Sequence, residues 1–194
     1  MRCEFLPIII DSVSKSYGDK KVLKSLDLNL PDKGIFCLLG ASGIGKTTLL
    51  RLLAGLEKPD SGCITGLEGK KISMVFQSDR LLPGSSAFDN VSLASSPEAA
   101  SLWLERLELG DAADKKPGKL SGGMQRRVAL ARALAFGGDV LLLDEPFKGF
   151  DGELKKRIIP YIIDFAKNAL VVLVTHDEKE AEIADSVFEL KAAV

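Results

Sequence analysis

The segment Gly40-Ala-Ser-Gly-Ile-Gly-Lys-Thr47 constrains the fold of this 194-residue chain more than any other part of it. It follows a short apolar run at residues 35–39, which predicts a buried strand, and it precedes a leucine-rich helical pattern. Glycines let a backbone wrap closely around phosphate groups, and the N–H groups and dipole of the next helix attract negative charge. The strand–loop–helix context therefore predicts a nucleotide site, rather than a glycine-rich turn that fits GxxxxGK[ST] by chance.

This phosphate loop and the first turn after it supply most of the predicted nucleotide contacts. Lys46 is expected to contact the β- and γ-phosphates, and the hydroxyl of Thr47 is expected to ligate Mg²⁺. A nucleoside triphosphate and Mg²⁺ are thus the expected ligands. The predicted contacts here are Gly40, Ala41, Ser42, Gly43, Ile44, Gly45, Lys46, Thr47 and Thr48.

A second acidic motif, Val140-Leu-Leu-Leu-Asp-Glu-Pro146, predicts a buried strand that ends in two carboxylates. Asp144 is well placed to hold Mg²⁺, and Glu145 to orient and deprotonate an attacking water. Two acids at a strand end are also common as a helix cap or turn. The phosphate loop earlier in the chain favours the catalytic interpretation.

His176 is the single histidine of the chain, and it ends an apolar run at residues 169–175. A lone histidine is more often structural than catalytic, and Asp177 after it suits a helix cap. Ligands of open α/β sheets bind at the carboxyl ends of strands, which favours a functional His176.

The order of the predicted elements indicates an α/β fold with a mainly parallel sheet and flanking helices. Short β-like runs at residues 8–13, 22–30 and 35–39, with turns between them, predict a small antiparallel layer leading into a central strand. Two more short strands are expected near residues 63–65 and 72–76. From Gly122 onward helix and strand alternate, at residues 122–136, 140–143, 153–167, 169–175, 178–184 and 187–190.

The middle of the chain, about residues 80–118, predicts helices broken at Pro83, Pro97 and Pro117. We therefore expect one domain over residues 1–194. Its core would comprise about residues 1–79 and 122–194, with a helical subdomain at about 80–121 inserted in it.

Composition excludes several other classes of protein. The chain is 46% hydrophobic and 27% charged with a formal net charge of −1, so no polybasic surface for nucleic acid or lipid is expected. Three distant cysteines, Cys3, Cys37 and Cys63, predict neither a disulfide framework nor a metal site. The N-terminal residues 1–10 do not fit a signal peptide, and no segment approaches the ~20 apolar residues that span a bilayer.

Residues 120–134, Leu-Ser-Gly-Gly-Met-Gln-Arg-Arg-Val-Ala-Leu-Ala-Arg-Ala-Leu, resemble the signature segment of ABC ATPases. Ser121 and the free N–H groups of Gly122 and Gly123 form a second anion site at a helix N-terminus. The resemblance implies that this site serves the γ-phosphate held by the opposite protomer of a dimer.

The remaining motifs resemble the same family in order and spacing. Tyr17 corresponds to the aromatic residue that stacks on adenine, although an ordinary turn aromatic is the alternative. Gln77 corresponds to the glutamine near Mg²⁺ and the attacking water, and it is a predicted metal contact. Asp151 corresponds to the D-loop aspartate that reaches across the dimer, and His176 to the histidine that contacts the γ-phosphate. Lys46, Gln77, Glu145 and His176 are the expected catalytic residues.

The sequence departs from the family pattern in three places. Met124 stands where glutamine is commonest, and Lys148-Gly149-Phe150 stand where Ser-Ala-Leu is common. The chain also ends at Val194, shortly after the last predicted strand, which suggests that it lacks the C-terminal extension of many family members and any regulation through one.

The resemblance implies an ATP-hydrolysing subunit that powers a membrane transporter by ATP-driven dimer closure. The segment from Asp79 to Val91 is most similar to the ATPases of nitrate, sulfonate and taurine importers. The expected partners are a second copy or a paralogue, a transmembrane permease bound through the helical subdomain, and an extracytoplasmic substrate-binding protein. Leu81, Leu82 and Phe88 are candidates for the permease groove, with core packing as the alternative. The subunit would be cytoplasmic, on the inner face of the cell membrane.

Three other functions share part of this evidence. An exporter or lipid-trafficking ATPase would carry the same motifs. A soluble, non-transport ABC ATPase usually carries tandem domains, a coiled coil or basic arms. A nucleotide-binding module without hydrolysis is disfavoured by Glu145 and His176.

Overall fold

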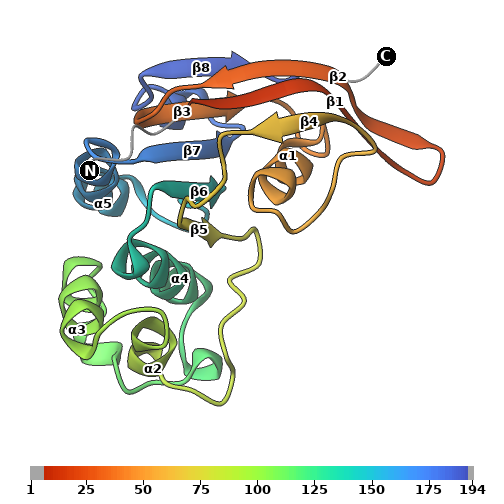
Figure 1. Cartoon of the computed structure of the whole chain (residues 1–194). Coiled ribbons are helices and arrows are strands. Elements are labelled where there is room, and N and C mark those ends of the chain that lie inside the picture. Colours follow the sequence, from red (N-terminus) through yellow and green to blue (C-terminus); the bar gives the residue numbers. More distant parts are fainter. Residues whose placement is uncertain (1–6, 192–194) are drawn as a thin grey trace.

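The computed structural model describes residues 7–191, so Cys3 lies outside the described residues. A five-stranded sheet with strand order β5-β6-β7-β3-β8 forms the centre of the molecule (Figure 1), and all its pairings are parallel. Its strands are β3 (Gly34–Leu39), β5 (Ile72–Val75), β6 (Val140–Asp144), β7 (Leu170–Thr175) and β8 (Ser186–Glu189). Every residue of β6 and β7 is buried, as expected for parallel strands covered on both faces.

A second, antiparallel sheet has the strand order β2-β1-β4 and lies beside α1 (Figure 1). It consists of β1 (Ile8–Tyr17), β2 (Lys20–Leu30) and β4 (Ser61–Thr65). Gly18, at φ 57°, helps to form the tight turn between β1 and β2. The predicted α/β class with a small antiparallel layer is therefore confirmed.

Helices cover both faces of the parallel sheet and extend away from one end of it. Figure 1 shows α2 and α3 beside α4, at the end of the molecule opposite the antiparallel sheet. The α-helices are α1 (Lys46–Leu53), α2 (Ala87–Ser92), α3 (Pro97–Arg106), α4 (Gly122–Phe136), α5 (Gly152–Ala166) and α6 (Glu178–Ala181), with single 3₁₀ turns at Gly110–Ala112 and Pro117–Lys119. Between residues 7 and 191, no helix is both long and apolar enough to cross a bilayer.

The core consists of two apolar clusters, one on each face of the parallel sheet. Alternate residues of a strand point to opposite faces, so Leu141 and Leu143 join one cluster while Val140 and Leu142 join the other. The first cluster packs against α4 and α5, and the second against α1 and the antiparallel sheet. The carboxyl ends of β3, β6 and β7 are thereby held rigidly at one edge of the sheet.

Pro97 and Pro117 each lie at the start of a helix, where a proline needs no N–H partner, so the helices of the middle segment are interrupted directly before these residues. One other predicted boundary was wrong in detail. The helix expected at residues 178–184 ends at Ala181. The apolar residues Ile8 and Ile10 near the N-terminus are buried in β1.

Candidate functional site

The phosphate loop joins the end of β3 to the start of α1, and glycine is required at two of its turns. Gly40 has φ 155°, and a Cβ there would lie 2.8 Å from the carbonyl oxygen of Leu190. Gly45 has φ 116°, and a Cβ there would lie 2.9 Å from Cγ1 of Val22. A larger residue at either position would strain the loop.

Lys46 folds back into this loop instead of extending into solvent. Its Nζ donates to the carbonyl oxygens of Gly40 and Ala41 at 2.5 and 2.9 Å, and the residue is 6% exposed. Burial lowers the pKa of Lys46, whereas the nearby charges of Glu145 and Asp144 act to raise it. The ammonium group is therefore held inside the loop that is expected to bind phosphate.

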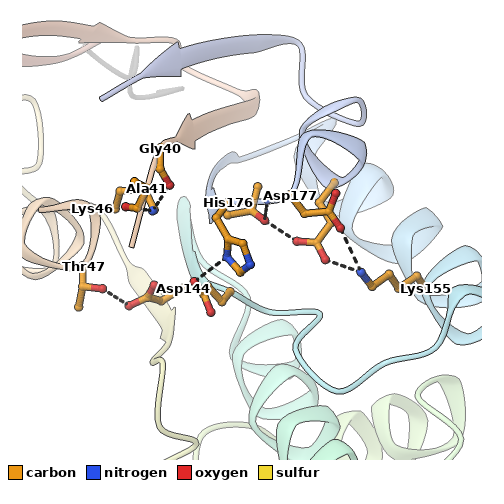
Figure 2. A network of polar contacts seen from close by, with 11 residues as sticks. Gly40, Ala41, Lys46, Thr47, Asp144, Lys155, His176 and Asp177 are labelled. Carbon is orange, nitrogen blue, oxygen red and sulfur yellow. Dashed lines mark hydrogen bonds and ion pairs between the residues drawn. The ribbon is translucent and has the colours of Figure 1, made fainter. Parts of the chain in front are cut away.

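Thr47 and Asp144 bring a hydroxyl and a carboxylate together at the start of α1. Thr47 Oγ1 donates to Asp144 Oδ2 at 2.8 Å (Figure 2), and Asp144 is 2% exposed. Burial raises the pKa of Asp144, and the hydrogen bond from Thr47 acts against that rise. Asp144 is thus bonded to the phosphate-loop helix and does not cap a helix of its own.

Hard oxygen donors of this kind fit Mg²⁺, which usually takes one or two protein ligands beside phosphate oxygens and water. No group of three or more acidic, histidine or cysteine side chains that could hold a metal occurs in residues 7–191. The pair Thr47 and Asp144 therefore fits an ion shared with a bound phosphate group rather than a metal site built from protein alone.

Glu145 and His176 face each other from the ends of β6 and β7. Glu145 Oε1 lies 3.0 Å from His176 Nδ1 (Figure 2). Glu145 has φ 51°, a conformation that costs energy for a residue with a side chain. Such strain is concentrated at functional sites, and here it accompanies the turn that directs Glu145 away from Asp144, its neighbour in the chain.

Two adjoining cavities bring most of the predicted residues together. One, of about 320 Å³, is lined by Tyr17, Ser42, Gly43, Gly45, Lys46, Thr47, Thr48, Gln77, Asp144 and Glu145, with Lys20 and Val22. The other, of about 660 Å³, is lined by Ala41, Ser42, Gln77, Glu145 and His176 among others. Tyr17 is 44% exposed and its hydroxyl donates to the carboxylate of Glu57, which leaves its ring at the mouth of the first cavity.

Six predicted residues line neither cavity among the residues that the structure describes. Ile44 packs against the apolar cluster beneath the antiparallel sheet. Ser121 is the N-cap of α4 and accepts a 3.3 Å hydrogen bond from the backbone N–H of Met124. Asp151 is the N-cap of α5 and accepts one of 2.8 Å from the N–H of Leu154. The other three residues are Gly40, Gly122 and Gly123.

The signature residues and the D-loop lie against each other. A Cβ on Gly123 would lie 3.1 Å from the carbonyl oxygen of Gly149, whereas a Cβ on Gly122 would meet nothing within 4 Å. Ser121 and Gly122 are exposed. Within one chain the predicted second anion site is therefore separate from the two cavities at the phosphate loop, and its first two residues are open to solvent.

Arg126 was not singled out by sequence reasoning, yet it holds the backbone around Gln77. Its Nη1 and Nη2 donate at 2.5 Å to the carbonyl oxygens of Phe76 and Gln77, and Nη1 lies 3.0 Å from Asp79 Oδ1. Asp79 Oδ1 is buried, and within residues 7–191 it forms this ion pair but accepts no hydrogen bond. Burial raises the pKa of Asp79, against the effect of Arg126. The sequence did contain a signal for this role, because Arg126 is a charged residue among the apolar positions of α4.

A second polar network supports the segment that carries His176. Lys155 of α5 donates to Glu180 Oε1 at 2.5 Å, and Thr175 Oγ1 donates to Glu180 Oε2 at 2.6 Å. Figure 2 shows Lys155 and Asp177 on the far side of His176 from Thr47 and Asp144. Asp177 caps α6 through the N–H of Lys179 at 2.9 Å, so the helix-cap interpretation of this residue is confirmed.

Known proteins share these features. The profile of the ABC transporter family matches residues 23–148. The sulfate/thiosulfate import ATP-binding protein CysA of Anthoceros angustus is 37% identical over 207 residues, covering 96% of this chain and 54% of that protein. The Fe(3+) ions import ATP-binding protein FbpC of Photobacterium profundum is 38% identical over 205 residues, covering 95% of this chain and 58% of that protein. The chain thus spans somewhat more than half the length of these relatives.

Solved structures match over nearly the whole fold. A dimeric, post-hydrolysis structure of the ATP-binding cassette MJ0796 bound to ADP and Pi has a TM-score of 0.88 and 30% identity, covering 95% of this chain and 94% of that chain. A second dimeric structure of MJ0796, described as a bacterial ABC transporter cassette, has a TM-score of 0.85. With its phosphate loop, paired acids and signature helix in one cassette fold, the chain belongs to the ABC transporter family.

Proposed function

We propose that this chain binds and hydrolyses ATP as one half of a dimer that powers a membrane transporter. The observation that carries the proposal is the convergence of Lys46, Asp144, Glu145 and His176 at the carboxyl ends of β3, β6 and β7. Ligands of open α/β sheets bind at such an edge. The match to a cassette bound to ADP and Pi supports the same assignment.

Each residue has a role in nucleotide binding that its position supports. The backbone N–H groups of residues 40–47 surround the phosphates, and Lys46 exchanges its bonds to the loop carbonyls for phosphate oxygens. Tyr17 stacks on the adenine ring at the cavity mouth. Thr47 and Asp144 would hold Mg²⁺, with Gln77 beside it, and the ion would supply positive charge to offset that of the phosphates.

Hydrolysis requires a water aligned with the γ-phosphorus and a base to take its proton. Glu145 accepts that proton while the water oxygen forms a bond to phosphorus. The bond from phosphorus to the β,γ-bridging oxygen breaks, and its electron pair stays on ADP. His176, 3.0 Å from Glu145, and Gln77 orient the water and contact the γ-phosphate.

The complete site needs a second chain. Ser121 and Gly122 are exposed, Gly123 is half-buried, and none of the three lines a cavity of its own protomer. In a dimer they would cap the γ-phosphate bound by the other protomer, and Asp151 would reach across the same interface. The dimeric state of the MJ0796 cassette supports this arrangement, with a second copy or a paralogue as the partner.

Import of a small solute is the transport function that the relatives favour. Both relatives described above are import ATP-binding proteins, for sulfate/thiosulfate and for Fe(3+). The finer affinity with nitrate, sulfonate and taurine importers rests on the segment after Gln77. The subunit would lie in the cytoplasm, on the inner face of the cell membrane, against a permease whose receptor is an extracytoplasmic substrate-binding protein.

The permease contact is proposed on the helical part of the chain. Leu82 is 47% exposed and is available to a partner, whereas Leu81 and Phe88 pack against the core. The proposed single domain comprises a core of about residues 1–79 and 122–194, with the helical subdomain at about 80–121 forming the permease groove. Hydrolysis reopens the dimer, and the permease uses the open–close cycle to alternate access.

A Glu145→Gln variant tests the hydrolytic assignment. Removal of the base should lower turnover by roughly 10²- to 10⁴-fold and should leave an ATP-bound dimer trapped, seen as a doubled mass in light scattering. Phosphate release at the unmodified rate would contradict the role of Glu145. An unmodified chain that releases no phosphate from ATP would contradict the function itself.

A further inference from the structure

A third cavity, of about 320 Å³, lies beside the phosphate site, and none of the roles given above uses it. Thr47, Gln77 and Asp144 line both this cavity and the one at the phosphate loop. Ser42, Gly43 and Lys46 line the phosphate-loop cavity and not this one. The two spaces therefore meet at the residues expected around Mg²⁺ and the γ-phosphate, and the third cavity extends away from the phosphate loop.

Three cationic side chains line this space. Arg51 comes from the last turn of α1, Arg80 from the segment after Gln77, and Lys148 from the D-loop. Asp144 is the one carboxylate among its lining residues, so positive charge predominates. Lys148 stands where the family pattern commonly has serine, so the charge at this position is a feature of this chain.

The three cations are largely available to a ligand. Arg51 lies 3.3 Å from Glu57 in a partly exposed ion pair, which contributes little stability. The guanidinium carbon of Arg80 lies 3.9 Å from the centre of the Phe76 ring, a stacking contact that leaves its N–H groups able to bind. No carboxylate oxygen within residues 7–191 lies within 4.0 Å of a charged nitrogen of Arg80 or Lys148. The charge of Lys148 affects the pKa of Asp79 from a longer distance, while Asp79 forms its ion pair with Arg126.

We propose that this cavity binds a tetrahedral oxyanion, the inorganic phosphate released by hydrolysis, on its way out of the site. The proposal rests on the proposed ATPase function for the source of the anion. Guanidinium groups bind two oxygens of such an anion at once, and an ammonium adds a compact charge. Arg51, Arg80 and Lys148 would thus hold phosphate after it passes Thr47, Gln77 and Asp144, while ADP stays on the phosphate loop.

The cavity is distinct from the site of the γ-phosphate in bound ATP. That phosphate must stay within reach of Lys46, which lines the other cavity. A like-charged pair of products separates more easily when the smaller one has its own cationic site. The proposal therefore predicts that Lys148 affects phosphate affinity more than ATP affinity.

Binding of radiolabelled inorganic phosphate to the magnesium- and ADP-loaded chain, measured by equilibrium dialysis, tests the site without turnover. A Lys148→Ser variant should bind phosphate roughly tenfold more weakly, the effect of losing one charge-assisted contact. Lys156→Ser is the matched control, because Lys156 is an exposed lysine of α5 whose side chain is 74% accessible. Equal phosphate affinity of Lys148→Ser and the unmodified chain would overturn the proposal.

Product inhibition of ATP turnover tests the origin of the anion. Added phosphate should inhibit the unmodified chain and the Lys156→Ser control alike, and roughly tenfold more phosphate should be needed to inhibit Lys148→Ser. Sulfate should compete for the site with comparable strength, since the cations recognise charge and tetrahedral shape. Phosphate that binds in dialysis but does not inhibit turnover would contradict the product assignment. A chain without ATPase activity would overturn the proposed function and leave the dialysis result to decide whether the anion site exists.

Discussion

The two glycine-rich segments at residues 40–47 and 121–123 both lead into helices, yet their surroundings differ completely. In the first, Lys46 is 6% exposed and bonded to Gly40 and Ala41, while Thr47 reaches the buried Asp144. In the second, Ser121 and Gly122 are exposed, and a side chain on Gly122 would meet open space. One segment is bonded into its own chain, and the other is open to solvent. Under the proposed function, these are two half-sites, each completed by a different molecule.

A Gly122→Asp variant should remove the function of the second segment while leaving the first intact. The added carboxylate should be neutral or favourable for folding, because it lies in the first turn of α4 and meets no atom within 4 Å. It should repel the partner's γ-phosphate and lower turnover by about a hundredfold. Gly118→Asp is the control, since Gly118 also faces open space near this helix. ATPase assays and thermal unfolding of both variants check this prediction. Full turnover in Gly122→Asp, or an equal loss of turnover in Gly122→Asp and Gly118→Asp, would contradict it.

An Arg126→Gln variant tests whether α4 connects the two half-sites. Ser121 caps this helix, and Arg126, just over one turn later, holds the carbonyls of Phe76 and Gln77. Losing the guanidinium leaves the buried Oδ1 of the partly exposed Asp79 unpaired, so stability should fall by roughly 3 kcal/mol. Turnover should fall as Gln77 loses its support. Asp79→Asn in the same background should recover part of the stability. Chemical denaturation of the two single variants and the double variant measures this coupling. Losses of stability that simply add in the double variant would show that Arg126 and Asp79 do not act as a pair.

Substitutions of Tyr17 test whether the nucleotide site of the phosphate loop extends to the ring at the cavity mouth. Tyr17→Ala removes the ring at the cavity mouth and should raise the KM for ATP roughly threefold to tenfold, with kcat little changed. Tyr17→Phe keeps the ring and loses the hydroxyl contact with Glu57. Steady-state kinetics that show equal KM values for all three chains would support the alternative of an ordinary turn aromatic.

Asp144→Asn should change stability and activity in opposite directions, with a smaller effect on stability than that of Arg126→Gln. Burial raises the pKa of Asp144 above its ordinary value of 3.8, so the stability that this group contributes is present at low pH and is lost as pH rises through the raised pKa. At neutral pH the metal-free Asn variant should therefore unfold a few degrees higher than the unmodified chain, while its ATP turnover is lost. The difference in unfolding temperature should narrow as pH falls through the raised pKa and should be smallest below pH 3.8, where Asp144 is protonated in both states. A lower unfolding temperature for the Asn variant at pH 7 would contradict this account of the charge.

Sequence patterns predicted those parts of the fold whose causes are local. The predicted bounds of α4 match the structure because Ser121 caps its start and Gly137, at φ 68°, ends it. The two buried strands of the acid and histidine motifs follow from unbroken apolar runs. Pro97 marks a helix boundary in the sequence, and in the structure it occupies the start of α3, directly after the cap Ser96.

The candidate site was predictable to the same degree. The phosphate loop and the pair at Asp144 and Glu145 are short motifs whose geometry depends on neighbours in sequence. Arg126 was missed because its partners, Phe76 and Gln77, lie about fifty residues away and become neighbours only when β5 packs beside α4. The roles of Ser121, Gly123 and Asp151 stay predictions, since their expected ligand is held by another chain.

Mixing two inactive variants tests the pairing of half-sites most directly. Lys46→Ala disables the phosphate loop, and Gly122→Asp disables the signature end. In a mixed dimer one composite site carries both defects and the other carries neither. Mixing the two inactive chains in equal amounts should restore about a quarter of the unmodified turnover, because half of the dimers are mixed and each has one intact site. No recovery at any mixing ratio, with both chains folded, would contradict the claim that each site is built from the phosphate loop of one chain and the signature of another.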